Sequence, residues 1–500
     1  MAIESVPRSS PYTGTELPHG RPFWIVDGRA YDFTEWMKIH PGGETWFGPS
    51  QGRDISALVH TYHRDPVRLR KFLARYEIEG FTERDILPKL GVPPFLLDPD
   101  FDATTDLPRL DYRDEGSLLA EIRRKVNATF SKRDLRRYDR AFDIVTWSIA
   151  ALHVATVALL VTNLIPAWAF VVAMVVTRTS LAGSGHYHLH RRWKDQRRLH
   201  LPLGKALFDI NYVGTSLIGA DGHVLLHHPY MGSGADVKKT FFDGMLRLHP
   251  ILRIPGYTLH KLGICVLGLS MRARELARFE RPRGKAPNRA DFWIVRGWLL
   301  VELVACAATG HIVAWLIQFL IVLWFNTFLV VASHDFEEAD DEEAELAAIP
   351  LPLRDDWAAR QICLSYDLKV VGNRWVDLFL SAGLSPHRVH HVLPYQGSGF
   401  ANLATEATVR EVCEENGIVW ERPRSLLFNR FPAVIRHYLL CPVKAAPPRP
   451  PAMPPPLNQF PVQPPPPPPP RAPVPAGSSG WRQVGELFRY TADGFRGVGV

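Results

Sequence analysis

The chain has 500 residues and a net charge of +7, with 46% apolar and 22% charged residues. This length excludes a single small binding module, because one domain usually takes about 100 to 200 residues. The five cysteines include no Cys-x-x-Cys pair, which excludes a disulfide framework and argues against a zinc site built on cysteine. The 43 prolines and 20 histidines are the unusual features, and many of the histidines are clustered.

The N-terminal part of the chain predicts a flexible lead followed by a small folded domain. Residues 1–18 are polar and contain no apolar core of a secretory signal, so we expect a flexible start. Residues 19–85 alternate short apolar runs with turn signals. Residues 23–26 and 30–33 are predicted strands around an Asp27-Gly28 turn, and helical patterns follow. This pattern is typical of an α+β domain.

A histidine pattern in this domain indicates a haem site. The strand segment Tyr31-Asp32-Phe33-Thr34 leads to His40-Pro41-Gly42-Gly43, and His60 and His63 lie farther along the chain. Two histidines on separate helices can bind a haem iron from both faces. Such an iron has no open position for O₂, so the centre passes single electrons.

These motifs resemble the cytochrome b5-type haem domain over about residues 20–80. The His-Pro-Gly-Gly tetrapeptide is the signature of that family. The resemblance implies that His40 is one axial ligand of haem b and that His63 is the second. His60 remains a competing candidate for the second position.

The next part of the chain predicts a membrane domain. Residues 86–135 are expected to form a linker with an amphipathic segment, and residues 136–440 contain four apolar stretches, at 141–162, 165–183, 292–308 and 312–333. A bilayer span needs about 20 apolar residues. We therefore expect an all-α, four-span integral membrane domain made of two hairpins. Two buried hairpins in a soluble domain are the alternative, but soluble helices average about 11–12 residues.

The distribution of charge predicts the orientation of these spans. Residues 185–290 carry 18 Lys and Arg side chains against 7 Asp and Glu, whereas the two hairpin tips carry no charge. Lys and Arg are enriched on the cytoplasmic side of membranes. Both termini and the basic segment are therefore expected in the cytosol. Because the basic segment lies between two membrane hairpins, we expect no nucleic-acid partner.

Residues 441–500 are predicted to be a disordered, proline-rich tail. Eighteen prolines lie between Pro442 and Pro475, and seven of them are consecutive. Such a composition favours an extended polyproline II segment.

Four groups of histidines follow the predicted spans, and their spacing indicates metal binding. Residues three or four apart lie on one face of a helix, so the histidines of each box can point at one metal. Neutral imidazoles suit iron among other metals, and eight or nine of them are too many for one ion. His188 would face away from its neighbours. The candidate ligands are His186, His190, His223, His227, His228, His334, His387, His390 and His391.

These boxes resemble the membrane fatty-acid desaturase/hydroxylase superfamily over about residues 140–430. The resemblance implies an O₂-dependent fatty acyl desaturase, an oxidoreductase with two non-haem iron ions bound by the histidines named above. His334 matches by position a further histidine found in many members. Together the two domains are similar to the cytochrome b5-related, desaturase-domain proteins of animals. The third box departs from fused front-end desaturases, because His387 stands where those usually have Gln.

The resemblance also implies partners and a location. The substrate would be a fatty acyl-CoA or an acyl-lipid, with O₂ and membrane lipids, in the endoplasmic reticulum membrane. The chain has no Gly-x-Gly-x-x-Gly fingerprint, so the electron donor is expected to be a separate NADH-dependent cytochrome b5 reductase. Two alternatives remain open: a hydroxylase with the same di-iron chemistry, and a membrane-tethered haem electron carrier without turnover.

Overall fold

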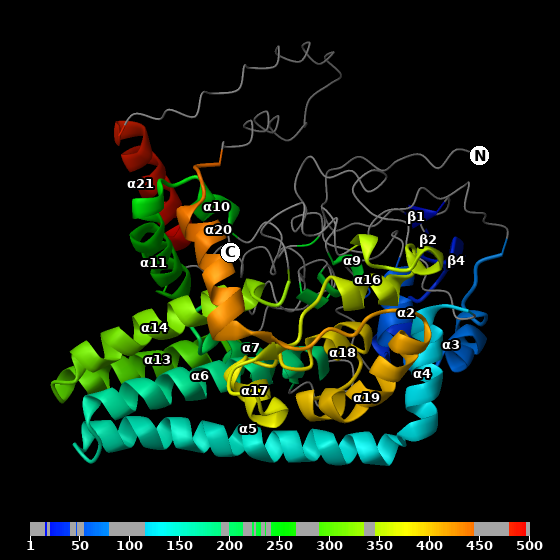
Figure 1. The fold of residues 1–500 in the computed structure, drawn as a ribbon, viewed down its shortest axis with the longest axis horizontal. Helices are drawn as coiled ribbons and strands as arrows, with labels where there is room; N and C mark the ends of the chain where they lie inside the picture. The colour runs from blue at the N-terminus through cyan, green and yellow to red at the C-terminus, as the bar shows by residue number, and fades with distance from the viewer. Residues whose placement is uncertain are drawn as a thin grey trace, which may run out of the picture.

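The computed structural model consists of a small N-terminal α+β domain that packs against a large helical body (Figure 1). Four long helices lie side by side in the body; some of the shorter helices gather at one end of them, next to the N-terminal domain, and others form a separate group above the long helices. The structure describes residues 16–17, 21–40, 47, 55–79, 116–191, 200–213, 223–224, 227–231, 236, 242–266, 290–334, 346–444 and 480–496.

The N-terminal domain is held together by a cluster of aromatic side chains. Two antiparallel strands meet at a turn where Asp27 and Gly28 have positive φ, as the sequence predicts. Trp24, Phe33 and Phe47 pack against one another in the core. The elements are β1 (Glu16–Leu17), β2 (Arg21–Pro22), β3 (Trp24–Val26), β4 (Arg29–Tyr31), η1 (Trp36–Lys38), α2 (Ser56–Tyr62) and α3 (Pro66–Leu73).

The helical body is built on α5 (Lys132–Val161), α6 (Ala167–His190), α13 (Ala290–Ala308) and α14 (Ile312–Val331). Ser131 and Asp134 form a reciprocal capping box that starts α5. Among the described residues, α5, α6 and α14 are long and apolar enough to cross a membrane. Their exposed apolar side chains, such as Trp147, Val172 and Leu316, provide a surface suited to lipid.

The third of the four expected spans is α13, which has 19 residues and is thus about as long as α14. Unlike α14, it carries charged residues. Glu302 is fully buried and accepts hydrogen bonds from the Arg178 guanidinium and from a ring nitrogen of His153, at 2.9 Å for the latter. Arg178 lies on α6 and His153 on α5. The carboxylate of α13 is therefore paired inside the bundle, where an unpaired charge would cost several kcal/mol.

Shorter helices complete the body. They are α7 (His200–Asp209), α9 (His228–Tyr230), α10 (Asp243–Leu246), α11 (Pro250–Val266), η8 (Leu351–Leu353), α16 (Trp357–Cys363), α17 (Arg374–Leu380), α18 (His387–Val392), α19 (Gly399–Glu415), η9 (Leu426–Arg430) and α20 (Phe431–Leu440). The two-residue strands β5 (Leu368–Lys369) and β6 (Arg424–Ser425) pair in parallel.

Three predicted boundaries need correction. The lead does not stay flexible to residue 18, because β1 pairs with β2. The segment 86–135 is more than a linker, because α4 (Leu118–Thr129) buries Leu119, Ile122 and Val126 in a core shared with α16 and α19. The helix that contains the apolar stretch 165–183 also extends beyond that boundary, because α6 continues through the first box to His190.

The prediction of disorder throughout residues 441–500 is wrong for α21 (Gly480–Arg496). This helix packs on α11, where a ring nitrogen of His260 lies 2.7 Å from the Tyr490 carbonyl oxygen and the two rings stack. Gly494 permits the close approach, because a Cβ there would lie 2.2 Å from the His260 carbonyl oxygen. The proline tract at 445–479 lies outside the described residues.

Candidate metal centre

The structure brings the rings of His40 and His63 together in the N-terminal domain, with their planes tilted by 53°. Their ring centroids lie 6.2 Å apart, and His40 also packs edge-on against Phe47. A metal bound between two imidazoles at about 2 Å from each, with about 1 Å from nitrogen to ring centre, requires about 6 Å between centroids. The pair therefore fits a haem iron with two histidine ligands.

The surroundings of His63 suit an iron ligand. Its Nδ1 lies 2.8 Å from the Val59 carbonyl oxygen, which places the proton on Nδ1 and directs Nε2 away from the helix. Desolvation lowers the pKa of His63 below its ordinary value, so the ring is neutral and its Nε2 lone pair can bind metal.

His60 is turned away from this pair. It is buried, and its Nε2 lies 2.9 Å from both carboxylate oxygens of Asp27, across the β3–β4 turn. The competing candidate is thus engaged by a carboxylate. Of the two, the geometry favours His63.

A cluster of five histidines lies at the end of α6. The ring nitrogens of His186 and His223 are 2.6 Å apart, those of His223 and His228 3.0 Å, and those of His186 and His390 3.1 Å. One nitrogen from each of five rings falls within 4.8 Å of the others. We call the set the five-histidine cluster: His186, His190, His223, His228 and His390.

A second cluster lies directly beside the first. His227, His334 and His391 bring their nitrogens within 4.8 Å of one another and are fully buried. His387 joins them, since its Nε2 is 3.1 Å from Nε2 of His391. We call this set the second cluster. The rings of His228 and His391 stack across the boundary, with centroids 4.4 Å apart.

The elements that carry these rings pack closely. Gly185 lets α6 lie against α7, because a Cβ there would be 2.4 Å from the Phe208 nitrogen. This contact fixes the turn of α6 that holds His186 and His190. The third box lies on α18, which is buried along its whole length.

All nine predicted ligands are therefore in the two clusters, and His188 is not. Its Nδ1 instead lies 2.9 Å from Nδ1 of His200, outside both clusters. Burial, reinforced by neighbouring imidazoles, lowers the pKa of His228 and of His391 well below the ordinary histidine value. Neutral rings that converge on one point in this way are suited to transition metals.

Sequence reasoning missed the groups that orient these rings. Both carboxylate oxygens of Asp236, itself buried, lie 2.9 Å from Nδ1 of His227. Gln361 Oε1 lies 2.8 Å from Nδ1 of His391, and the Leu364 carbonyl oxygen 3.0 Å from Nδ1 of His334. Each contact leaves Nε2 directed into the second cluster. No motif marks Asp236 or Gln361 in the sequence.

We expect Asp236→Asn to lower the iron affinity of the second cluster. The amide keeps the size of the side chain but lacks the charge that holds the His227 ring. Such outer partners typically contribute about 10- to 100-fold in metal affinity. Iron content at graded chelator concentrations would measure the loss, with the exposed Asp355→Asn as a control. Equal chelator resistance in Asp236→Asn and the unmodified protein would contradict the expectation.

Comparison with known proteins divides the chain into the same two parts as the structure, an N-terminal domain and a helical body. Residues 162–423 match the family model described as fatty acid desaturase, and residues 15–79 match that of the cytochrome b5-like heme/steroid binding domain. The acyl-lipid omega-13 desaturase of Chlamydomonas reinhardtii is 23% identical over 82% of this chain and 91% of its own length.

Two further relatives match over a short part of the chain. Delta(5) fatty acid desaturase A of Dictyostelium discoideum is 39% identical over 11% of this chain and 12% of its own length. The cytochrome b5-related protein of Drosophila virilis is 31% identical over 12% of this chain and 42% of its own length. No solved structure matches the chain.

The fold, the clusters and these matches define an oxidoreductase in which a cytochrome b5-like domain precedes a helical membrane domain. The chain belongs to the fatty acid desaturase family. The first domain implies haem and the family implies iron, so both predicted classes of cofactor are supported.

Proposed function

We propose that this protein is an O₂-dependent fatty acyl desaturase whose two histidine clusters hold a pair of iron ions. The main support is that nine buried histidines fall into two adjacent sets, and that the ring nitrogens within each set converge. Iron bound there would supply the reduction of O₂ and the removal of two hydrogens from an acyl chain. The long relative is itself named an acyl-lipid desaturase, which favours this reaction over hydroxylation.

The residues of the chain bind, orient and shield the metals. The rings in the clusters are buried, so bulk water has little access to the reacting centre. Asp236 and Gln361 fix the rotation of the His227 and His391 rings. His40 and His63 would hold haem b, which accepts electrons singly from a separate NADH-dependent cytochrome b5 reductase.

Lipid analysis of cells that express the protein tests this function. Fatty acids should appear that are lighter than their precursors by two hydrogens. A product heavier by one oxygen would identify a hydroxylase instead. Purified protein that holds haem iron alone, with no further iron, would identify an electron carrier without turnover.

We further propose that all four long helices span the endoplasmic reticulum membrane and that both termini and the clusters are cytosolic. The tips of the two hairpins touch, because His311 Nε2 lies 3.1 Å from Asn163 Oδ1. Two hairpins with adjoining tips enter the membrane from the same side. The excess of Lys and Arg in residues 185–290 supports a cytosolic location for that side.

Tags inserted after Asn163 and after Thr309 should therefore resist protease added outside sealed microsomes, while a tag after Lys444 is cleaved. Protection should disappear when detergent opens the vesicles. Cleavage of the Thr309 tag alone would show that α13 and α14 do not form a spanning hairpin. Cleavage of the Asn163 and Thr309 tags, with the Lys444 tag protected, would show that the orientation is opposite to the one proposed.

A further inference from the structure

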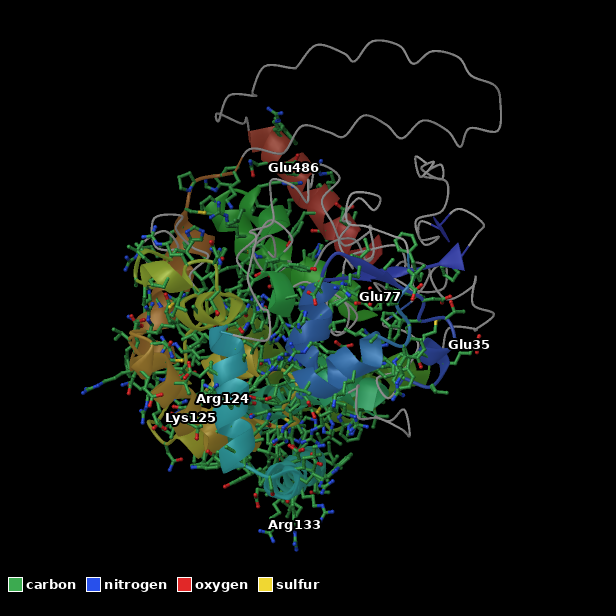
Figure 2. All side chains as sticks on the ribbon, turned by 90° about the vertical axis from the view of Figure 1, so that its right-hand side faces the viewer. Glu35, Glu77, Arg124, Lys125, Arg133 and Glu486 are labelled. Atoms are coloured by element: carbon green, nitrogen blue, oxygen red, sulfur yellow. The ribbon has the colours of Figure 1, made fainter. Side chains whose placement is uncertain are left out.

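The haem domain is docked on the helical body through the end of α2, the helix that leads into His63. Arg123 of α4 donates a hydrogen bond of 3.1 Å to the Thr61 carbonyl and another to the His60 carbonyl. Arg64 donates in the opposite direction, with 3.0 Å to the Phe130 carbonyl. Figure 2 shows the N-terminal domain lying beside α4 on this face.

These hydrogen bonds hold α2 in a defined position on the helical body. Arg123 is buried, and its guanidinium also lies over the Tyr395 ring, 5.7 Å from the centroid. Two arginines, one from each side of the contact, thus use carbonyl oxygens as partners. Hydrogen bonds from charged donors contribute about 1.5–3 kcal/mol each, so the docked arrangement is well defined.

Tyr62 is the side chain that this docking inserts into the metal domain. Its hydroxyl donates a 3.1 Å hydrogen bond to the carbonyl of Val224, the residue after His223. Its ring lies nearly parallel to that of His190, at 21°, with centroids 6.3 Å apart. Tyr62 therefore contacts one ring of the five-histidine cluster, His190, and the backbone next to His223, and its own chain neighbour is His63.

We propose that Tyr62 is the contact through which electrons pass from the haem to the five-histidine cluster, an inference that rests on the proposed function. The route runs from the His63 ring through one peptide unit to the Tyr62 ring, and from there to His190 and to the Val224 carbonyl. It contains covalent bonds, one hydrogen bond and one ring contact.

The electron balance is simple. Each passage oxidises one ferrous haem to the ferric state and reduces one ferric ion of the pair to the ferrous state. Two passages supply two electrons. With two protons from solvent and the two hydrogens removed from the acyl chain, they reduce one O₂ to two waters. Tyr62 gains and loses nothing in this scheme, because it is a bridge and not a carrier.

The proposal is tested with full-length protein carrying Tyr62→Leu or Tyr62→Phe. The haem is reduced under anaerobic conditions, and its reoxidation by the iron pair is followed by stopped-flow absorbance. We expect Tyr62→Leu to slow the reoxidation by roughly tenfold or more. Tyr62→Phe keeps the ring and should transfer faster than Tyr62→Leu. A rate in Tyr62→Leu equal to that of the unmodified protein would overturn the proposal.

A second measurement separates electron transfer from docking. Val67→Cys of α3 and Arg124→Cys of α4, which line the same hollow at the interface, are joined by a short bis-maleimide in protein whose histidine clusters have been depleted of iron. Tyr62→Leu should leave the cross-link yield and the haem spectrum unchanged. If the yield falls together with the rate, Tyr62 is a docking residue and the proposed route is wrong. If the unmodified protein holds no iron beyond haem, the proposed function itself fails.

Discussion

His334→Ala should abolish desaturation and lower the non-haem iron content while the haem spectrum stays unchanged. His334 is completely buried, and its ring lies 4.8 Å from that of His227 and 5.0 Å from that of His391, centroid to centroid. Its removal takes one candidate ligand nitrogen from the second cluster, which has only four histidines among the described residues. The loss of iron affinity should exceed the roughly 10- to 100-fold loss expected when an outer partner such as Asp236 is changed.

His188→Gln is the matched control for this experiment. His188 lies in the same stretch of α6 as two members of the five-histidine cluster, yet it pairs with His200 instead. Glutamine can keep a polar contact there, so iron content and product formation should stay near those of the unmodified protein. Iron would be measured by elemental analysis and haem by its absorbance. Full iron occupancy and normal turnover in His334→Ala would remove His334 from the site.

Eight of the nine histidines could be read from the sequence because they lie in boxes with the spacing of one helical face, whereas His334 was implied only by its position in the family resemblance. Their division into two clusters could not be read from the sequence. His227 and His228 are neighbours in the chain, and so are His390 and His391, yet the members of each pair belong to different clusters. Consecutive helical residues point about 100° apart, so one short segment can serve both metals. Which ring serves which cluster depends on how three separate segments pack.

The outer partners were missed for a related reason. Asp236 follows His227 by nine residues, and Gln361 lies on α16, far in sequence from the third box. An isolated buried carboxylate or amide has no pattern of its own until tertiary contacts place it next to an imidazole. The same holds for Tyr62, which the sequence shows only as an aromatic residue before His63.

The error over α21 came from treating residues 441–500 as one composition. The prolines end at Pro475, and the following residues form a helix whose Leu487 and Tyr490 side chains lie against Gly256 of α11, while Trp481 and Phe488 are exposed. Gln483 Oε1 accepts a hydrogen bond of 2.7 Å from the His249 backbone. Composition averaged over a long window therefore concealed a short helix that needs α11 for its packing.

The haem ligands offer the sharpest comparison between two nearby histidines. His63→Ala in the full-length protein should abolish haem binding and, with it, desaturation supported by NADH and reductase. The reason is that the remaining His40 would have no partner on the opposite face of the iron, since the His60 ring is engaged by Asp27. Absorbance of the purified protein would show the loss.

His60→Gln is the companion variant, and it should keep the spectrum of a haem iron with two histidine ligands. Its amide can still donate a hydrogen bond to the Asp27 carboxylate, so the β3–β4 turn stays anchored to α2. His60→Ala would remove that bond, and a loss of stability there would show as a lower melting temperature with the spectrum retained. If His60→Gln lost the spectrum while His63→Ala kept it, His60 would be the second ligand, and α2 would have to rotate from the position seen here when haem binds.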